Sequence, residues 1–385
     1  MGHADRDHAA LSPSASKRWM SCTPSAKLEE QFPNSTSEAA EEGTLCHELC
    51  EGKIRNKFNP EIFSGRRLAS LKRRCKENPL WDDEMERTSD EYVEKIYADA
   101  LGFSVMPMVL AEQRLDLTDW IPDGFGTGDC VLIGDDLLCI YDYKHGKGVP
   151  VFADHNPQMM IYALGAVKTF GWMADIKRVK MCIIQPRLDS ITEFEMTVEE
   201  LMAWGKEVLK PLAEKASKGE GEFVPGDHCR FCKAKAQCRA RAEVAFGLKD
   251  KAGLLPPLIS REEAGELIKV GEIVSSWLSD LKDWVLTEVL NGAEVPGWKA
   301  VEGRSNRSFT DQSKAFEVLM NHDIPRALLY ETKPISLSAA EKIVGKKVFA
   351  ELCGEFIERP AGKPTLVPAS DKRESIKTSA EEAFK

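Results

Sequence analysis

The stretch GDCVLIGDDLLCIYDYK, residues 128–144, predicts a β-hairpin at the centre of the fold. Two apolar runs flank Gly134, Asp135 and Asp136, and a two-residue turn at the two aspartates would place residue 134 opposite residue 137. The same register places Asp129 opposite Asp142. Lys144 then lies on the same face as Asp142, because side chains alternate between the faces of a strand. A three-residue loop would break this pairing.

Two carboxylates in such a pair need compensation. Paired side chains lie about 5 Å apart at Cβ, where like charges destabilise the hairpin. A divalent cation bound by Asp129 and Asp142 provides that compensation, and oxygen ligands favour Mg²⁺ or Mn²⁺. With Lys144, this set has what phosphodiester hydrolysis requires, namely a metal that activates water and a cation near the developing charge. In the alternative reading, the aspartates only end their strands and Lys144 is solvated.

The segments around the hairpin alternate between helical and extended patterns. Helices are predicted for residues 38–57 and 89–101, and strands for residues 105–117 and 179–186. Asn156 and Pro157 predict the start of a further helix, with Asn156 as its N-cap. A sheet flanked by helices follows, which places the fold in the α/β or mixed α+β class.

The C-terminal third differs from the rest. Gly253, Pro256 and Pro257 predict a linker over residues 246–257, between a first domain at residues 1–245 and a mainly helical accessory domain at residues 258–385. Ser260 and Glu263 predict a capping box that opens a long helix with apolar residues at helical spacing. Asn291 and Gly292 predict its end.

Four other side chains could join the hairpin carboxylates. Glu112 lies on the strand before the hairpin, and His47 lies on the helix at residues 38–57. Gln158 and Tyr162 are four residues apart and share one helical face. Each of the four, taken alone, also fits an ordinary packing role.

The order of these residues resembles the PD-(D/E)xK nuclease superfamily, and specifically its RecB-like branch. Gly43 to His47 matches a G-x-x-x-H motif, and a motif-II aspartate, a (D/E)-x-K strand and a Q-x-x-x-Y helix follow. The resemblance implies a restriction-endonuclease-like mixed sheet flanked by helices, and a metal-dependent DNA nuclease. It implies metal binding by His47, Asp129 and Asp142, with Glu112 as a less specific match, water activation by Lys144, and organisation of the site and the DNA strand by Gln158 and Tyr162.

The cysteines form a second pattern. The chain has eleven cysteines and no apolar N-terminal segment typical of a secretory signal, so we expect reduced thiols and metal ligands among them. Cys229, Cys232 and Cys238 lie in the spacing C-x2-C-x5-C, and Cys22 is a better candidate than His228 for a fourth ligand. The other seven cysteines are expected to be small buried residues.

AddB-like and CRISPR-associated exonucleases of the RecB-like branch resemble this chain in having one N-terminal cysteine and such a trio. The resemblance implies a [4Fe–4S] cluster at Cys22, Cys229, Cys232 and Cys238, which would join both ends of the nuclease domain. Thr23 departs from the usual Cys-Pro of these proteins. A Zn²⁺ site and a site without metal remain the alternatives.

The composition leaves the class of partner open. The net charge of −10 does not indicate nucleic-acid binding. It does not exclude it either, because local basic groups and bound metal decide whether a protein contacts phosphates. We expect a DNA exonuclease that acts on single strands or duplex ends in the cytoplasm, with no membrane association. The whole chain resembles uncharacterised phage and prophage proteins, which implies the host cytoplasm and DNA processing with helicase or recombination proteins. The alternative is a non-catalytic iron–sulfur DNA-binding accessory protein of recombination.

Overall fold

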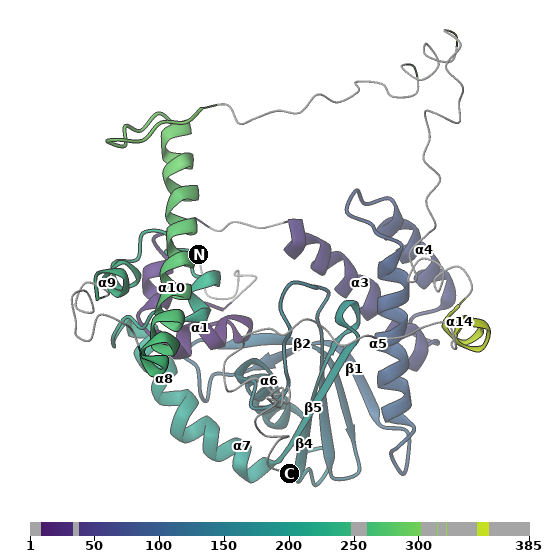
Figure 1. Cartoon of the computed structure of the whole chain (residues 1–385). Coiled ribbons are helices and arrows are strands. Elements are labelled where there is room, and N and C mark those ends of the chain that lie inside the picture. The colour runs from purple at the N-terminus through teal and green to yellow at the C-terminus, as the bar shows by residue number, and fades with distance from the viewer. Residues whose placement is uncertain are drawn as a thin grey trace, which may run out of the picture. The chain divides into compact units, whose positions relative to one another are not determined.

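The computed structural model describes residues 9–33, 38–247, 260–301, 314, 321 and 345–353. Contacts divide the chain into two units, Met1–Ala300 and Val301–Lys385, and each is described by itself. The first unit contains the sheet and most of the described helices (Figure 1).

A five-stranded sheet forms the centre of the first unit. Its strands follow the chain order, β1-β2-β3-β4-β5. Strands β3 and β4 are parallel and the other neighbours are antiparallel. The strands are β1 (Met108–Asp116), β2 (Phe125–Gly134), β3 (Leu137–Tyr143), β4 (Arg178–Gln185) and β5 (Ser190–Thr197). The predicted mixed α/β class is confirmed.

The predicted hairpin register is also confirmed. Gly134 pairs with Leu137, and the ladder between β2 and β3 runs without a shift to Cys130 and Tyr141. Asp135 adopts φ 49°, the left-handed conformation that a tight two-residue turn requires. Asp129 and Asp142 are the next residues beyond the last pair of this ladder.

Helices cover both faces of the sheet (Figure 1). Helix α6 (Pro157–Phe170) packs on the face that carries Val131 and Ile140, whereas α3 (Glu38–Phe58) and α5 (Glu84–Ala100) pack on the opposite face. Asn156 caps α6 as predicted, because its side chain accepts hydrogen bonds from the first turn. Helix α5 begins five residues before the predicted position, where the Asp82 carboxylate accepts a hydrogen bond from the N–H of Glu84.

The remaining elements surround this core. They are the helices α1 (Ser16–Ser21), α2 (Ser25–Glu29), α4 (Gly65–Lys76), α7 (Val198–Trp204), α8 (Lys210–Lys218), α9 (Arg239–Gly247) and α10 (Arg261–Leu290), the 3₁₀ turns at Pro13–Ala15, Pro186–Leu188 and Asp227–Phe231, and a π-helix at Gly205–Leu209. Helix α8 packs against α1 and α2, so the N-terminal segment lies beside a helix that follows the whole sheet in sequence.

The predicted capping box of α10 is confirmed, because the Ser260 side chain and the Glu263 side chain each bind the other residue's backbone N–H. Most of the predicted linker, residues 248–257, lies outside the described residues. In the second unit, α14 (Lys346–Cys353) is the helix described. None of the helices described is both long enough and apolar enough to cross a membrane.

Candidate metal and cysteine sites

Three neighbouring strands bring carboxylates to one position in the sheet. The β1–β2 ladder pairs Ala111 with Cys130 and Gln113 with Gly128, which places Glu112 opposite Asp129. The β2–β3 register continues to Asp142 on the next strand. Like charges in such a row destabilise the sheet unless a cation compensates them.

His47 from α3 completes a group of donors with two of these carboxylates. One ligand atom from each of His47, Glu112 and Asp129 lies within 4.8 Å of the others, a spacing that could hold a metal ion. His47 Nδ1 lies 3.4 Å from Asp129 Oδ2. The backbone N–H of Tyr143 donates to Asp129 Oδ2 at 2.8 Å and fixes the carboxylate in place. One nitrogen and two carboxylates suit Mn²⁺ and Mg²⁺ as well as other divalent ions.

Glu112 occupies an unusual conformation within its strand. Its φ of 51° lies in the left-handed region, which is strained for a residue with a side chain. Burial raises the pKa of Glu112 to about 7, and the neighbouring Asp129 adds to this shift. Burial also raises the pKa of Asp129, although the nearby His47 opposes the effect. A bound cation would relieve this electrostatic strain.

Asp142 lies beside this group but is oriented differently. It is 2% exposed, and its Oδ1 accepts hydrogen bonds from Gln158 Nε2 at 2.9 Å and Lys144 Nζ at 3.2 Å. Its Oδ2 lies 3.0 Å from Lys144 Nζ but has no hydrogen bond of good geometry among the described residues. Within the described part of the chain, that buried oxygen has only this ion pair with Lys144, and it could join a bound cation.

Lys144 is held between the carboxylates and α6. Burial lowers its pKa, but Asp142 and Asp129 outweigh this effect and raise the pKa above the ordinary lysine value. Lys144 Nζ also donates to Gln158 Oε1 at 3.3 Å. The ammonium is therefore charged at neutral pH.

Gln158 and Tyr162 lie on one face of α6, as predicted. Gln158 Nε2 lies 3.5 Å from the Tyr162 hydroxyl, and the ring is 7% exposed. A Cβ at Gly126 would lie 2.9 Å from that ring and 2.8 Å from Pro13, so glycine is needed for this close approach. The N-terminal turn thus packs over the helix that orients Asp142.

A polar network behind the site was not predicted from the sequence. The ring of Tyr143 meets His47 edge-on, with the ring centres 5.5 Å apart, and its hydroxyl donates to Thr88 at 2.9 Å. That hydroxyl also lies 3.0 Å from His145 Nδ1, and His145 Nε2 lies 3.1 Å from Glu42. Because side chains alternate along a strand, Tyr143 points to the other face of the sheet from Asp142 and Lys144. Its partners His47 and Thr88 come from the helices α3 and α5.

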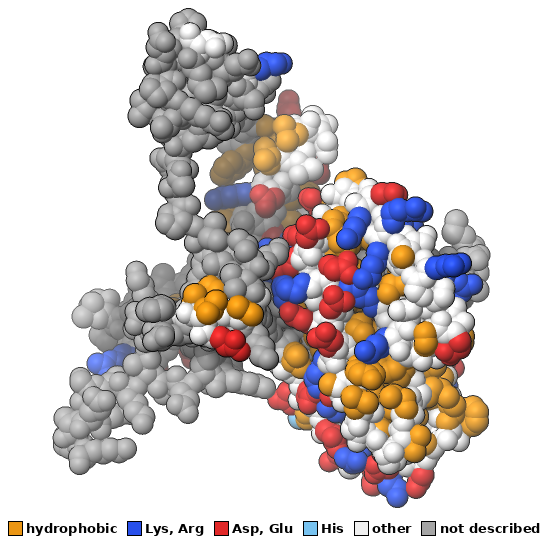
Figure 2. Space-filling model, turned by 90° about the vertical axis from the view of Figure 1, so that its right-hand side faces the viewer, with side chains coloured by type: hydrophobic (Ala, Val, Ile, Leu, Met, Phe, Trp, Pro, Cys, Tyr) orange, Lys and Arg blue, Asp and Glu red, His pale blue; other side chains and the backbone are white. Residues whose placement is uncertain are grey.

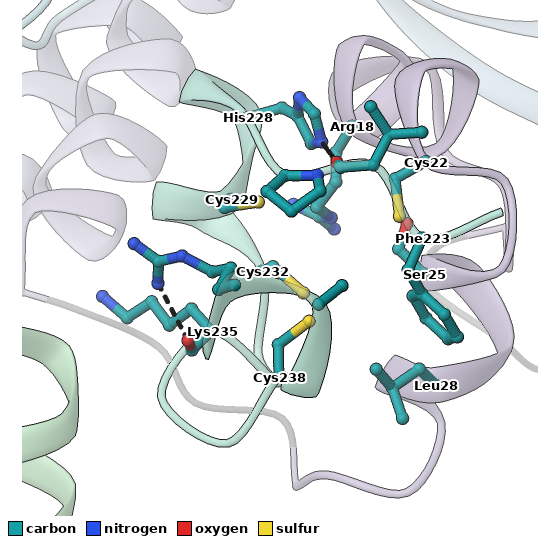
Figure 3. A pocket seen from close by; sticks show the side chains of 14 residues that line it. Arg18, Cys22, Ser25, Leu28, Phe223, His228, Cys229, Cys232, Lys235 and Cys238 are labelled. Carbon is teal, nitrogen blue, oxygen red and sulfur yellow. Dashed lines mark hydrogen bonds between the residues drawn. The ribbon is translucent and has the colours of Figure 1, made fainter. Parts of the chain in front are cut away.

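Four cysteines line one pocket at the other end of the unit. Cys22 follows α1, whereas the other three lie in and after the 3₁₀ turn Asp227–Phe231. Figure 3 shows their sulfur atoms around a common space. Burial raises the pKa of Cys232 to about 12 and raises that of Cys229, so both thiols are protonated at neutral pH. The nearby His228 is held instead by the carbonyl of Val224.

The protein itself joins the two segments that carry these cysteines. Arg18 donates to the carbonyl of Phe231 at 2.8 Å and forms an ion pair with Glu29 at 2.8 Å. Glu29 in turn accepts a hydrogen bond from the N–H of Lys233 at 2.8 Å. Six of the seven cysteines outside the pocket are buried as predicted, namely Cys46, Cys50, Cys75, Cys130, Cys139 and Cys182, whereas Cys353 is only half-buried.

The chain was compared with known families and solved structures. A family model described as "Protein of unknown function (DUF2800)" matches residues 8–374. The chain belongs to this family. Among solved structures, one titled "Crystal structure of SSO0001" is 13% identical in sequence, with a TM-score of 0.24 over 57% of this chain and 95% of that chain.

The candidate residues of this DUF2800 member form two separate groups. His47, Glu112 and Asp129 form the tight donor group, and Glu112, the least specific of the sequence candidates, is part of it. Asp142, Lys144 and Gln158 form a second group bound to one another beside the first. The roles of these residues and of the four cysteines stay predictions.

Proposed function

We propose that this chain is a divalent-metal-dependent DNA nuclease that hydrolyses phosphodiester bonds, acting as an exonuclease on single strands or duplex ends. The observation that carries the proposal is the convergence of His47, Glu112 and Asp129 beside a buried aspartate and a charged lysine. A protein that only binds DNA has no need for this combination of donors and cation. The order of the residues along the chain, which resembles RecB-like nucleases, supports the same reading.

Each residue has a role that follows from its position. His47, Glu112 and Asp129 would hold Mg²⁺ or Mn²⁺, with Asp142 Oδ2 as a further oxygen donor. A bound ion would supply a Lewis acid for the phosphoryl oxygen and would lower the pKa of the attacking water.

Lys144, which is charged at neutral pH, stabilises negative charge that develops on the phosphoryl group. Gln158 makes hydrogen bonds to both Asp142 and Lys144, and these contacts keep the lysine side chain beside Asp142. Tyr162, which is buried beside Gln158, would help to position Gln158.

The four cysteines are proposed to hold a [4Fe–4S] cluster. The order and spacing of the four cysteines, which resemble those of AddB-like exonucleases, support a cluster. Four thiolates also suit a structural Zn²⁺ site, so analysis of iron, sulfide and zinc in the purified protein decides between them.

The deciding experiment is a cleavage assay. Anaerobically purified protein is incubated with end-labelled single- and double-stranded DNA and with closed circular DNA, in Mg²⁺, in Mn²⁺ and in EDTA. We expect metal-dependent degradation of the DNA with ends. The Lys144→Ala variant should be slower by about 100- to 1,000-fold, because one charge-stabilising group is removed.

The matched control is Lys147→Ala, which removes an exposed lysine three positions away. It should leave the rate near that of the wild type. Degradation that survives Lys144→Ala, or that proceeds in EDTA, would contradict the proposed mechanism. If the wild-type protein binds DNA but never cleaves it, the chain is a binding protein of DNA recombination instead.

A further inference from the structure

A buried arginine connects the cysteine pocket with the long helix α10. Arg241, in α9, is 2% exposed and is among the residues that line the pocket. Its Nη1 donates to Asp280 of α10 at 2.7 Å and to the carbonyl of Lys235 at 2.8 Å. Its Nη2 donates to Ser276 of α10 at 3.2 Å. One side chain therefore contacts both the loop that carries the cysteines and the middle of α10.

The third nitrogen of this guanidinium has no partner. Arg241 Nε is buried and makes no hydrogen bond to any described residue. A buried N–H without an acceptor is unfavourable, and an arginine has no acceptor of its own to satisfy it. The charge of Arg241 acts on the cysteine site, because it opposes the burial that raises the pKa of Cys229. An anionic acceptor in the pocket would satisfy the free donor.

Helix α10 depends on this contact for its attachment. None of the residues of α10 is buried, and among the described helices it packs against α9. Its other links reach the same short segment, since Trp277 Nε1 donates to the carbonyl of Ala236 at 3.1 Å and Asp280 pairs with Lys235 at 2.9 Å. The segment that carries Cys232 and Cys238 thus also holds α10.

We propose that Arg241 couples loading of the four-cysteine site to the attachment of α10, by donating Nε–H to a thiolate sulfur of the loaded site. The inference rests on the metal–thiolate site proposed above. Metal binding converts neutral thiols to thiolates and releases their protons, which creates an anionic acceptor in the pocket. With its Nε–H bound to the loaded cysteine site, the guanidinium keeps its ion pair with Asp280 of α10. Removal of the metal then weakens the attachment of α10.

The first test measures amide hydrogen exchange over residues 261–290 of the full-length chain. The chain is reconstituted anaerobically with ferrous iron and sulfide, and it is compared with the same chain after chelation. We expect exchange of α10 to be faster by about tenfold or more without the metal, because the charged hydrogen bond that fixes Arg241 is then absent. Strands β1 to β3 serve as the internal reference and should not change.

The second test uses variants in the loaded protein. Coupling between two sites is reciprocal, so Asp280→Asn, which weakens the attachment of α10, should also speed the release of iron to a chelator. Arg241→Gln should do both and abolish the response of α10 to metal. Arg239→Gln is the matched control, since it removes an exposed arginine from the same helix and should do neither.

The outcomes separate the two proposals. Failure of the chain to bind iron or zinc would overturn the metal site and the coupling together. Metal that binds without changing the exchange of α10, or an Asp280→Asn variant that frees α10 without speeding metal release, would overturn the coupling alone. Neither result touches the nuclease proposal, which the cleavage assay tests.

Discussion

At the scale of single residues, the candidate metal site is electrostatically strained. Glu112 and Asp129 lie between two pairs of the ladder, Ala111 with Cys130 and Gln113 with Gly128, and the pKa of each is raised, mainly by burial. Glu112 reaches this position through a left-handed backbone that a glutamate rarely adopts. Such an outlier points to a functional constraint, because packing alone would favour an apolar residue here.

This strain predicts how stability depends on pH. Glu112 ionises at about its ordinary pKa of 4.5 in the unfolded chain but at about 7 in the folded one. The folded state therefore binds more protons between these values, and its stability falls as pH rises through them. In EDTA, we expect the unfolding midpoint of the wild-type protein to fall from about pH 5 to about pH 8, by about 2–4 °C for each kcal/mol of stability removed.

Glu112→Gln supplies the control for this measurement, because the amide keeps the shape and does not ionise. Its midpoint should decline less over the same range, and saturating Mn²⁺ should raise the wild-type midpoint more than that of the variant. A wild-type midpoint that rises with pH in EDTA, or that the variant matches at every pH, would contradict the prediction.

At the scale of elements, the hairpin could be predicted and its surroundings only in part. A two-residue turn fixes register, so the position of Asp129 relative to Asp142 followed from local sequence. The orientation of the Asp142 carboxylate could not be predicted in this way, because Lys144 and Gln158, on separate elements, both donate hydrogen bonds to it. The partners of Tyr143 likewise depend on contacts between distant segments, because Thr88 lies on α5.

Helix α4 is the element best suited to contact a phosphate backbone. It carries six Lys and Arg residues in GRRLASLKRRCK and no acidic residue, although the chain as a whole is acidic. It packs on α3, where Gly52 leaves room for the side chain of Leu71. Glu48 of α3, next to His47 in the sequence, forms an ion pair with Arg74. The side of the molecule shown in Figure 2 carries basic side chains among acidic ones on its upper part, whereas the sequence of α4 contains basic residues and no acidic one.

Neutralising α4 should therefore weaken DNA binding in a salt-dependent way. For the double variant Arg66→Gln and Arg73→Gln, we expect the slope of log K against log salt with single-stranded DNA to fall by about 0.7 for each phosphate that the protein no longer neutralises. Fluorescence anisotropy at several salt concentrations measures this slope. The double variant Lys206→Gln and Lys210→Gln, which also removes two exposed charges, should leave it unchanged. Equal slopes for the two double variants would exclude α4 from the path of the strand.

At the scale of the whole molecule, the first unit is closed by contacts between its two ends. Arg18 and Glu29 bind the backbone near Cys232, and α1 and α2 pack on α8. Cys22 and Cys229 then meet at one pocket although the whole sheet lies between them in sequence. A metal group there, as proposed, would cross-link a long loop and stabilise the fold mainly by restricting the unfolded chain.

Removing one ligand should open this closure without touching the candidate metal site in the sheet. A cross-link over a loop of about 200 residues stabilises by up to about 5 kcal/mol in the chain-entropy model, so Cys22→Ser should lower the unfolding midpoint by about 10 °C. The variant should also lose its iron and sulfide, and brief proteolysis should cut it first within residues 9–33. Cys353→Ser, which removes a thiol of the second unit, is the control and should keep the metal and the midpoint.

Because His47, Glu112 and Asp129 belong to other elements, the folded fraction of Cys22→Ser at low temperature should still bind Mn²⁺. If Cys22→Ser keeps its full iron content and its midpoint, Cys22 is not a ligand and the two ends are held by protein contacts alone.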